Sequence, residues 1–289
     1  MGYLHIDNLY KNTEILNFKE CYAMEKIHGT SAHISWKENK VSFFSGGESH
    51  SKFLTLFDED KLTTTFEELF EFDVILFGEA YGGKQQGMSE TYGKELKFIV
   101  FDVKVGDFWL DVLNAKNVAD KLGLDFVDFV KCATDIEKLD FERDRPSTQA
   151  KLNGIKEDRL REGVVLRPLI ELKKNNGDRI IVKHKHEKFL ETRTKREVNP
   201  ERLIVLEEAE DIAKEWVTPM RLNHVLDKLG NPDEITAIGD VIKEMIKDVF
   251  REAEREIVES KEASKSIGKL TAKMYKSRIS KIQEARKDE

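Results

Sequence analysis

A lysine begins the pattern of residues in this sequence that is most suggestive of chemistry. Lys26 lies in the stretch EKIHGTS, three positions before Gly29, and an alternating run typical of a strand follows it. A lysine amine becomes a nucleophile once it has lost its proton, so Lys26 is either an ordinary solvated cation or the centre of the chemistry. Because Lys-x-x-Gly occurs by chance in most long sequences, other residues must decide between the two.

Further polar residues lie in predicted strands along the chain. Glu79 ends the strand in FGEAYGG, and Glu162 opens the strand in REGVVLRP. Phe101 lies in the middle of FIVFDVKV, where a phenylalanine usually belongs to the core. Lys183 and Lys185 are two positions apart near the end of a strand, so their side chains share one face. Each signal is weak alone, but they form an ordered set that starts with a lysine and ends with paired lysines.

A basic stretch follows the last of these strands, although the chain as a whole carries a net charge of −7. Residues 183–196 contain six Lys or Arg and two Glu. The stretch is either a solvated basic face or a local phosphate-binding surface on an acidic protein. Composition leaves both interpretations open.

The elements that must position these residues are mostly strands in the first two-thirds of the chain. Helical patterns interrupt the strands without a regular βαβ alternation, which favours an α+β fold with antiparallel sheets. The predicted strands cover residues 31–36, 40–45, 73–83, 96–105, 162–168 and 179–185, and the predicted helices 65–72, 111–124 and about 148–160.

After residue 199 the character of the sequence changes. Strand signals end, and apolar residues recur at steps of three and four from Ile235 to Ala253, as in an amphipathic helix. We therefore expect two domains, residues 1–199 and residues 200–289, of which the second is small and all-α.

Bulk composition excludes several classes of protein. Hydrophobic residues make up 39% and charged residues 36% of the 289 residues, which is typical of a charge-rich globular protein. No apolar run reaches the ~20 residues of a membrane span, and the amino terminus lacks the pattern of a signal peptide. Only Cys21 and Cys132 occur, without the spacing of a disulfide framework or a zinc site, so we expect a protein of the reducing cytoplasm.

The ordered set resembles the nucleotidyltransferase motifs shared by ATP-dependent ligases and RNA-capping enzymes. The stretches EKIHGTS, FGEAYG, FIVFDVKV, EGVVLRP and VKHK are most similar to those of the phage type-two RNA ligases and the related RNA-editing ligases. Residues 217–230 and 239–254 resemble the helical C-terminal domain of this family, whereas DNA ligases carry an OB fold after the last motif. The resemblance implies an adenylyltransferase domain of antiparallel sheets with flanking helices, followed by a helical domain that engages RNA.

The resemblance also implies a reaction in three steps. Lys26 attacks the α-phosphorus of ATP, AMP passes to an RNA 5′-phosphate, and an RNA 3′-hydroxyl then displaces AMP. Lys183, Lys185 and a bound Mg²⁺ or Mn²⁺ would favour the neutral form of the attacking amine and offset phosphate charge. The expected partners are RNA ends or a nicked duplex, as in RNA repair, and a monomer is the default.

By the same resemblance, the nucleotide and the metal ion have their own residues. Glu79 accepts hydrogen bonds from the ribose, Phe101 stacks on adenine, and Glu162 lies at the metal-bound phosphates. Glu25 acts through its backbone in adenine recognition. The other residues expected to bind the nucleotide are Ile27, Thr30, Lys183 and Lys185.

The ligation step is assigned to other positions. By the resemblance His28 faces the reacting phosphate, and the alternative for this residue is a packing role. Arg221, Asp248 and Glu252 match positions of the helical domain that matter for ligation. For Asp248 and Glu252 the alternative is a solvated acidic pair on one helix face. The sequence departs from the family where relatives carry arginine, since Met24 and Gly46 occupy those places.

Two other functions remain open on the sequence alone. One is a DNA ligase or a capping-type nucleotidyltransferase, which the helical C-terminal region disfavours. The other is a non-catalytic RNA-binding module on the same fold, which would not need the ordered set of lysines and carboxylates.

Overall fold

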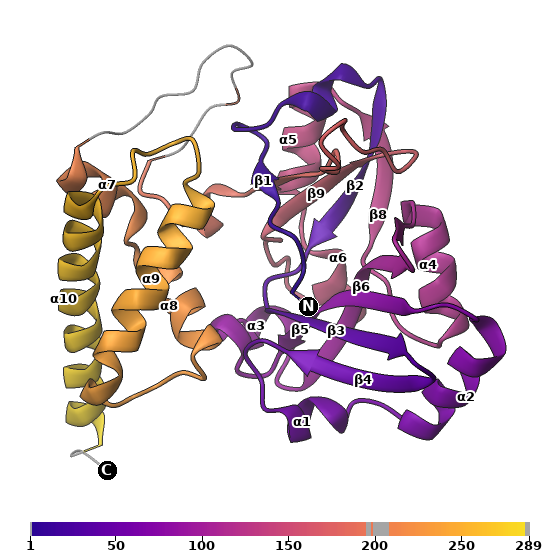
Figure 1. The fold of residues 1–289 in the computed structure, drawn as a ribbon, viewed down its shortest axis with the longest axis horizontal. Coiled ribbons are helices and arrows are strands. Elements are labelled where there is room, and N and C mark those ends of the chain that lie inside the picture. Colours follow the sequence, from indigo (N-terminus) through magenta and orange to yellow (C-terminus); the bar gives the residue numbers. More distant parts are fainter. Residues whose placement is uncertain (1, 195–197, 199–207, 287–289) are drawn as a thin grey trace. The chain divides into compact units, whose positions relative to one another are not determined.

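The computed structural model describes residues 2–194, 198 and 208–286. The chain forms two compact units, Met1–His186 and Glu187–Glu289. Figure 1 shows the first unit in indigo to pink and the helices of the second in orange to yellow. The domain boundary expected between residues 199 and 200 lies outside the described residues. The mixed class with antiparallel sheets and C-terminal helices is confirmed.

Two five-stranded sheets form the frame of the first unit (Figure 1). The first sheet has the strand order β1 (Asp7–Asn8), β10 (Val182–Lys185), β9 (Gly163–Pro168), β2 (Glu20–Lys26) and β8 (Phe129–Ala133). The second has the order β4 (Lys40–Ser45), β3 (Thr30–Lys37), β5 (Val74–Gly82), β6 (Leu96–Val105) and β7 (Phe108–Trp109). Among these described strands, only the pairing of β1 with β10 is parallel.

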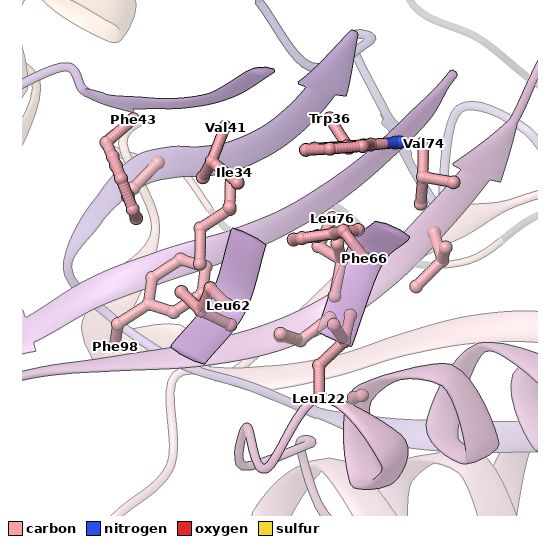
Figure 2. Close-up of a cluster of buried hydrophobic side chains, with 14 of the residues drawn as sticks. Ile34, Trp36, Val41, Phe43, Leu62, Phe66, Val74, Leu76, Phe98 and Leu122 are labelled. Carbon is pink, nitrogen blue, oxygen red and sulfur yellow. The ribbon is translucent and has the colours of Figure 1, made fainter. Parts of the chain in front are cut away.

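Alternation along β3 explains how the second sheet folds. Ala32, Ile34 and Trp36 lie on one face and are almost completely buried. Three helices cover that face: α1 (His50–Leu54), α2 (Glu59–Leu69) and α4 (Val112–Lys121). The Trp36 ring stacks on Phe66 of α2 at 5.6 Å between centroids (Figure 2). Burial of each such side chain stabilises the unit by about 1.5–3 kcal/mol.

The remaining helices of the first unit are short. They are η1 (Glu14–Asn17), η2 (Gln85–Gly87), α3 (Ser89–Tyr92), α5 (Ile136–Asp144) and α6 (Thr148–Leu152). The helix predicted over about 148–160 is therefore wrong beyond Leu152. Gly154 follows with φ +86°, a left-handed conformation that ends the helix.

The second unit is helical throughout its described secondary structure. It contains η3 (Glu187–Phe189), α7 (Ala209–Trp216), α8 (Pro219–Lys228), η4 (Ile235–Ala237), α9 (Ile238–Glu252) and α10 (Lys261–Ala285). Its core includes Trp216, Met245 and Tyr275. The amphipathic pattern from Ile235 corresponds to η4 and α9. Among the described residues, no helix is long and apolar enough to cross a membrane.

Candidate functional site

The first motif lies where the chain crosses from one sheet to the other. Lys26 is the last residue of β2, residues 27–29 make the crossing, and Thr30 begins β3. Strand β9 pairs with β2 and brings Glu162, which directly precedes it, beside Lys26. Strand β5 pairs with β3 and brings Glu79 from the other sheet. The strand pairing thus gathers at one junction residues that are far apart in the sequence.

Glu162 is the centre of this junction. Its carboxylate is fully buried, and Oε2 lies 2.8 Å from Lys26 Nζ and 3.1 Å from His28 Nδ1. Lys185 Nζ lies 3.0 Å from the other oxygen, Oε1. Burial alone raises the pKa of Glu162, but Lys26, Lys185 and His28 together hold it well below its usual range. Glu162 is therefore a charged, buried carboxylate that holds three basic side chains together.

One oxygen of Glu162 has capacity left for a ligand. Oε1 forms an ion pair with Lys185, and within the described part of the chain it accepts no hydrogen bond. A buried carboxylate oxygen with an open lone pair fits a divalent cation. In the described part of the chain, no three His, Cys, Asp or Glu side chains gather as a metal site. Mg²⁺ takes one or two carboxylates and completes its shell with water and phosphate oxygens, so the single carboxylate of Glu162 fits this ion.

Glu79 has the opposite electrostatic character. Burial raises its pKa to about 8, and the nearby negative charge of Glu162 adds to the rise against the opposing effect of Lys26. Its Oε1 accepts a hydrogen bond from the Gly29 N–H at 3.1 Å. At neutral pH the junction therefore holds one protonated and one ionised carboxyl, an arrangement that separates their chemical roles.

Two glycines allow the backbones to meet closely enough. A Cβ at Gly29 would lie 2.3 Å from the carbonyl oxygen of Ala80 in β5. A Cβ at Gly163 would lie 2.2 Å from the carbonyl oxygen of His184 in β10. Both distances are far below a normal contact, so the glycines after Lys26 and Glu162 are required by packing of the strands.

The paired lysines lie on β10, as their spacing predicted. Lys183 pairs with Val165 and Lys185 with Gly163 in the ladder with β9. Lys183 is buried, with 8% of its surface exposed. His184, between the two, lies against Asp140 of α5 at 2.6 Å.

The basic stretch 183–196 is not one solvated face. Its first residues belong to a buried strand of the first unit, and residues from Glu187 onwards belong to the second unit. Lys195 and Arg196 lie outside the described residues. Whether the stretch contacts phosphates stays a prediction.

Phe101 lies at an irregularity in its strand. Phe77 of β5 pairs with Asp102, whereas the next residue, Gly78, pairs with Val100. Phe101 is left without a partner in the ladder, as in a β-bulge, and its side chain is partly exposed. A bulge re-aims a side chain relative to regular alternation. The stacking of Phe101 on adenine stays a prediction.

A buried ionic cluster beneath Phe101 was missed by sequence reasoning. Asp102 is fully buried and accepts hydrogen bonds from Arg167 Nη1 at 2.9 Å, Arg179 Nη1 at 2.5 Å and the Tyr3 hydroxyl at 2.6 Å. The Tyr3 ring lies 4.9 Å from that of Phe101. The only sequence signal was a charged residue in an apolar strand, which cannot identify partners 65 and 77 positions away.

The Glu25 side chain is occupied by a structural contact. It accepts hydrogen bonds from the Ser147 hydroxyl at 2.5 Å and from the N–H groups of Thr148 at 2.9 Å and Gln149 at 3.2 Å. These groups form the N-terminus of α6, which favours a carboxylate. The Glu25 N–H donates to the Asp128 carbonyl at 2.8 Å, and a role of the Glu25 backbone in nucleotide binding stays a prediction.

The other residues of the first motif are mainly buried. Ile27 packs with Met24 in an apolar cluster that also contains Tyr81 and Tyr92. Met24, at a place where relatives carry arginine, is 2% exposed, so a charged side chain would not fit without a partner here. Thr30 is also buried.

Gly46 is the second departure from the arginines of relatives. A Cβ at this position would lie 3.3 Å from Thr30 Oγ1. The Ser31 carbonyl oxygen lies at the same distance, so a larger residue would have to shift both neighbours by a few tenths of an ångström.

In the second unit, Arg221 and Asp248 form a buried pair. Arg221 Nη1 donates to Asp248 Oδ2 at 2.7 Å, and Lys228 and Arg251 also contact this carboxylate. Arg221 is 1% and Asp248 2% exposed, so the alternative of a solvated acidic pair does not hold for Asp248. Glu252 lies at the edge of the cluster, half-buried beside Arg251. A role of these residues in ligation stays a prediction.

A family model described as RNA ligase matches residues 19–185, more than half of the chain. The chain belongs to the RNA ligase family. The match includes every predicted site residue of the first unit, from Glu25 to Lys185. No curated protein matches this family member.

Solved structures share the fold of this RNA ligase family member. A Naegleria gruberi RNA ligase with PPi is 18% identical, with a TM-score of 0.52 over 66% of this chain and 57% of that one. A mutant of the Naegleria enzyme with ATP and Mn is 16% identical, with a TM-score of 0.52 over 65% of this chain and 57% of that one. The chain thus spans less than two-thirds of the length of these relatives.

Proposed function

We propose that this protein joins an RNA 3′-hydroxyl to an RNA 5′-phosphate through a lysyl-AMP intermediate at Lys26. The observation that carries the proposal is the buried carboxylate of Glu162 with Lys26, His28 and Lys185 around it. A nucleophilic amine, basic groups for phosphates and a carboxylate for a divalent cation are what nucleotidyl transfer from ATP needs. Family membership supports the same reaction.

In the first step, the Lys26 amine attacks the α-phosphorus of ATP. The new bond joins Nζ to phosphorus, the bond to the bridging oxygen breaks, and pyrophosphate leaves. Because Lys26 Nζ lies 2.8 Å from Glu162, this ion pair has to open and the ammonium has to lose its proton to solvent before attack. The positive charges of Lys183 and Lys185 offset the negative charge of the phosphates during transfer.

Glu162 would hold Mg²⁺ or Mn²⁺, because one of its buried oxygens accepts no hydrogen bond from any residue that the structure describes. When bound, the ion supplies charge neutralisation at the phosphates. Once Lys26 has left the carboxylate, Glu162 would be available to hold the ion. The structure of the Naegleria gruberi mutant contains ATP and Mn, which supports both ligands.

The nucleotide contacts follow from the junction. Glu79, protonated at neutral pH, can both donate a hydrogen bond to a ribose hydroxyl and accept one. Phe101 offers its ring to adenine from the bulge. The backbones of Glu25 and Ile27 and the hydroxyl of Thr30 complete the proposed nucleotide set.

The helical region over residues 200–289 engages RNA in this proposal, and residues 1–199 carry out adenylylation. A row of exposed lysines along α10 supports it: Lys261, Lys265, Lys269, Lys273 and Lys276. Their spacing of three or four residues places them on one side of the helix, about 6 Å apart for a step of four. Within the described residues, none of the five has an ion-pair partner. Such a row of unpaired cations on an acidic protein suits a phosphate backbone.

The decisive experiment follows the label of α-labelled ATP in the presence of Mg²⁺. We expect one AMP per wild-type chain, no label on Lys26→Ala and full label on Lys116→Ala, a matched change at an exposed lysine of α4. Undiminished label on Lys26→Ala would refute the mechanism. The labelled protein is then offered nicked RNA and nicked DNA duplexes, and sealing of DNA alone would refute the substrate.

A further inference from the structure

The two cysteines, 111 positions apart in the sequence, face each other in the first sheet. Cys21 of β2 and Cys132 of β8 are direct partners in the antiparallel ladder. Their sulfur atoms lie 3.9 Å apart, and both are thiols. The sequence indicated no disulfide, since such a pairing depends on the register of two strands and not on cysteine spacing.

The backbone geometry at this pair suits a disulfide. Two residues further along, the Thr134 N–H donates to the Lys19 carbonyl, which marks that pair as hydrogen-bonded. Pair types alternate along an antiparallel ladder, so Cys21 and Cys132 also form a hydrogen-bonded pair, with Cα atoms about 5.5 Å apart. Disulfides span Cα distances of about 4.4–6.8 Å. The sulfurs can therefore approach by side-chain rotation without separating the strands.

The two thiols differ in access and acidity. Cys21 is fully buried, whereas Cys132 is partly exposed. The contact with Cys21 lowers the pKa of Cys132, while the contact with Cys132 and burial raise the pKa of Cys21. Cys132 is thus the residue that reacts first, with a resolving thiol beside it, as in redox-sensitive pairs.

We propose that Cys21 and Cys132 form a reversible intramolecular disulfide on exposure to an oxidised small-molecule disulfide such as oxidised glutathione. The Cys132 thiolate attacks one glutathione sulfur, and the first glutathione thiolate leaves. The Cys21 sulfur then attacks Cys132, the second glutathione leaves, and the Cys21 proton passes to it through solvent. Two protein thiols and one oxidised glutathione give one protein disulfide and two reduced glutathiones.

The bond would join β8, an edge strand, to the strand that carries Lys26 at its end. Because it closes a long loop in the unfolded chain, the oxidised protein should unfold at a higher temperature. The proposal does not depend on ligase activity, since it rests on the geometry and the exposure of the two thiols.

The test treats the full-length protein with oxidised glutathione and measures the intact mass. We expect a loss of about 2 Da, disappearance of both thiols together, a melting temperature higher by at least about 2–4 °C and full reversal by dithiothreitol. Cys21→Ser should instead keep one glutathione, about 305 Da, on Cys132. Cys132→Ser should stay unmodified, because Cys21 is buried.

Three results would overturn the proposal. They are a stable glutathione adduct on the wild-type chain, a disulfide-linked dimer, or two thiols that remain after treatment. The wild-type mass decides the matter even if a serine variant folds poorly.

Discussion

Two carboxyl groups from different sheets meet at the junction in different protonation states. Glu162 is ionised because three basic side chains face it, and Glu79 is protonated because burial and Glu162 oppose its charge. Folding therefore takes up a proton at Glu79 over a pH range in which the unfolded chain would release it. The two residues contribute to stability with opposite dependence on pH.

The pH dependence can be tested at Glu79. Its pKa is raised from 4.5 to about 8, so its contribution to stability is complete below pH 4.5 and is lost as the pH rises towards 8. Between pH 5 and pH 8 the free energy of unfolding of the wild type should fall relative to that of Glu79→Gln by at least about 1 kcal/mol, the equivalent of one pKa unit. Urea unfolding at several pH values measures the difference. The control Glu71→Gln, at an exposed position, should run parallel to the wild type, and parallel profiles for Glu79→Gln would contradict the expectation.

At the scale of elements, a buried ion pair links β6, next to its bulge, to strand β9. Asp102 of β6 contacts Arg167 of β9, and both side chains are almost fully buried. The cluster holds the strand of Phe101 against the sheet that carries Lys26. Its effect on the junction is one of positioning.

Removal of the Asp102 charge should therefore destabilise the first unit. Asp102→Asn leaves the buried guanidinium groups of Arg167 and Arg179 with less negative charge, and we expect a loss of about 3–5 kcal/mol in the free energy of unfolding. The matched control is Asp120→Asn, which breaks an exposed pair with Lys116 and should change stability by no more than about 0.5 kcal/mol. Equal effects of the two substitutions in urea unfolding would contradict a structural role for the cluster.

The elements also show what could be predicted from the sequence. The strand over residues 96–105 was predicted with its observed bounds, because turn signals flank a long β-rich run. Strand β2 was missed because five consecutive residues are buried and no alternation marks it. Lys26, which ends this strand, therefore lies outside every element predicted from the sequence. The members of the junction were predicted as a set, but their contacts depend on pairing of distant strands and on no local signal.

For the whole molecule, we propose that the first unit carries out adenylylation and the second unit binds RNA. All residues proposed for adenylylation precede residue 186, and the lysine row of α10 belongs to the second unit. We expect a fragment of residues 1–199 to form lysyl-AMP and to seal pre-adenylylated RNA poorly, because strand joining needs two aligned ends. Sealing by the fragment at the rate of the full chain would assign the helical unit another role.

The lysine row can be tested by the salt dependence of RNA binding. Replacement of the five α10 lysines by glutamine should weaken binding to nicked RNA and reduce the slope of log affinity against log salt by up to about 4.5, at about 0.9 per phosphate contact. Replacement of the same five by arginine keeps the charge and should keep the slope. Unchanged slopes for the glutamine variant would place the RNA elsewhere.

The pairing of β1 with β10, the last described strand in the sequence, also affects the order in which the protein folds during synthesis. Asp7 pairs with Val182, and Asn8 with Lys183. The two strands of this ladder are therefore synthesised near the start and near the end of the first unit. The second sheet, whose strands lie between residues 30 and 109, is complete much earlier. A nascent chain can therefore bury the core under α2 before Glu162 and Lys185 have been synthesised and can contact Lys26. Ribosome-bound chains stalled before β10 would contain the folded second sheet but not the assembled junction. Nucleotide binding should therefore become possible only late in the synthesis of the first unit.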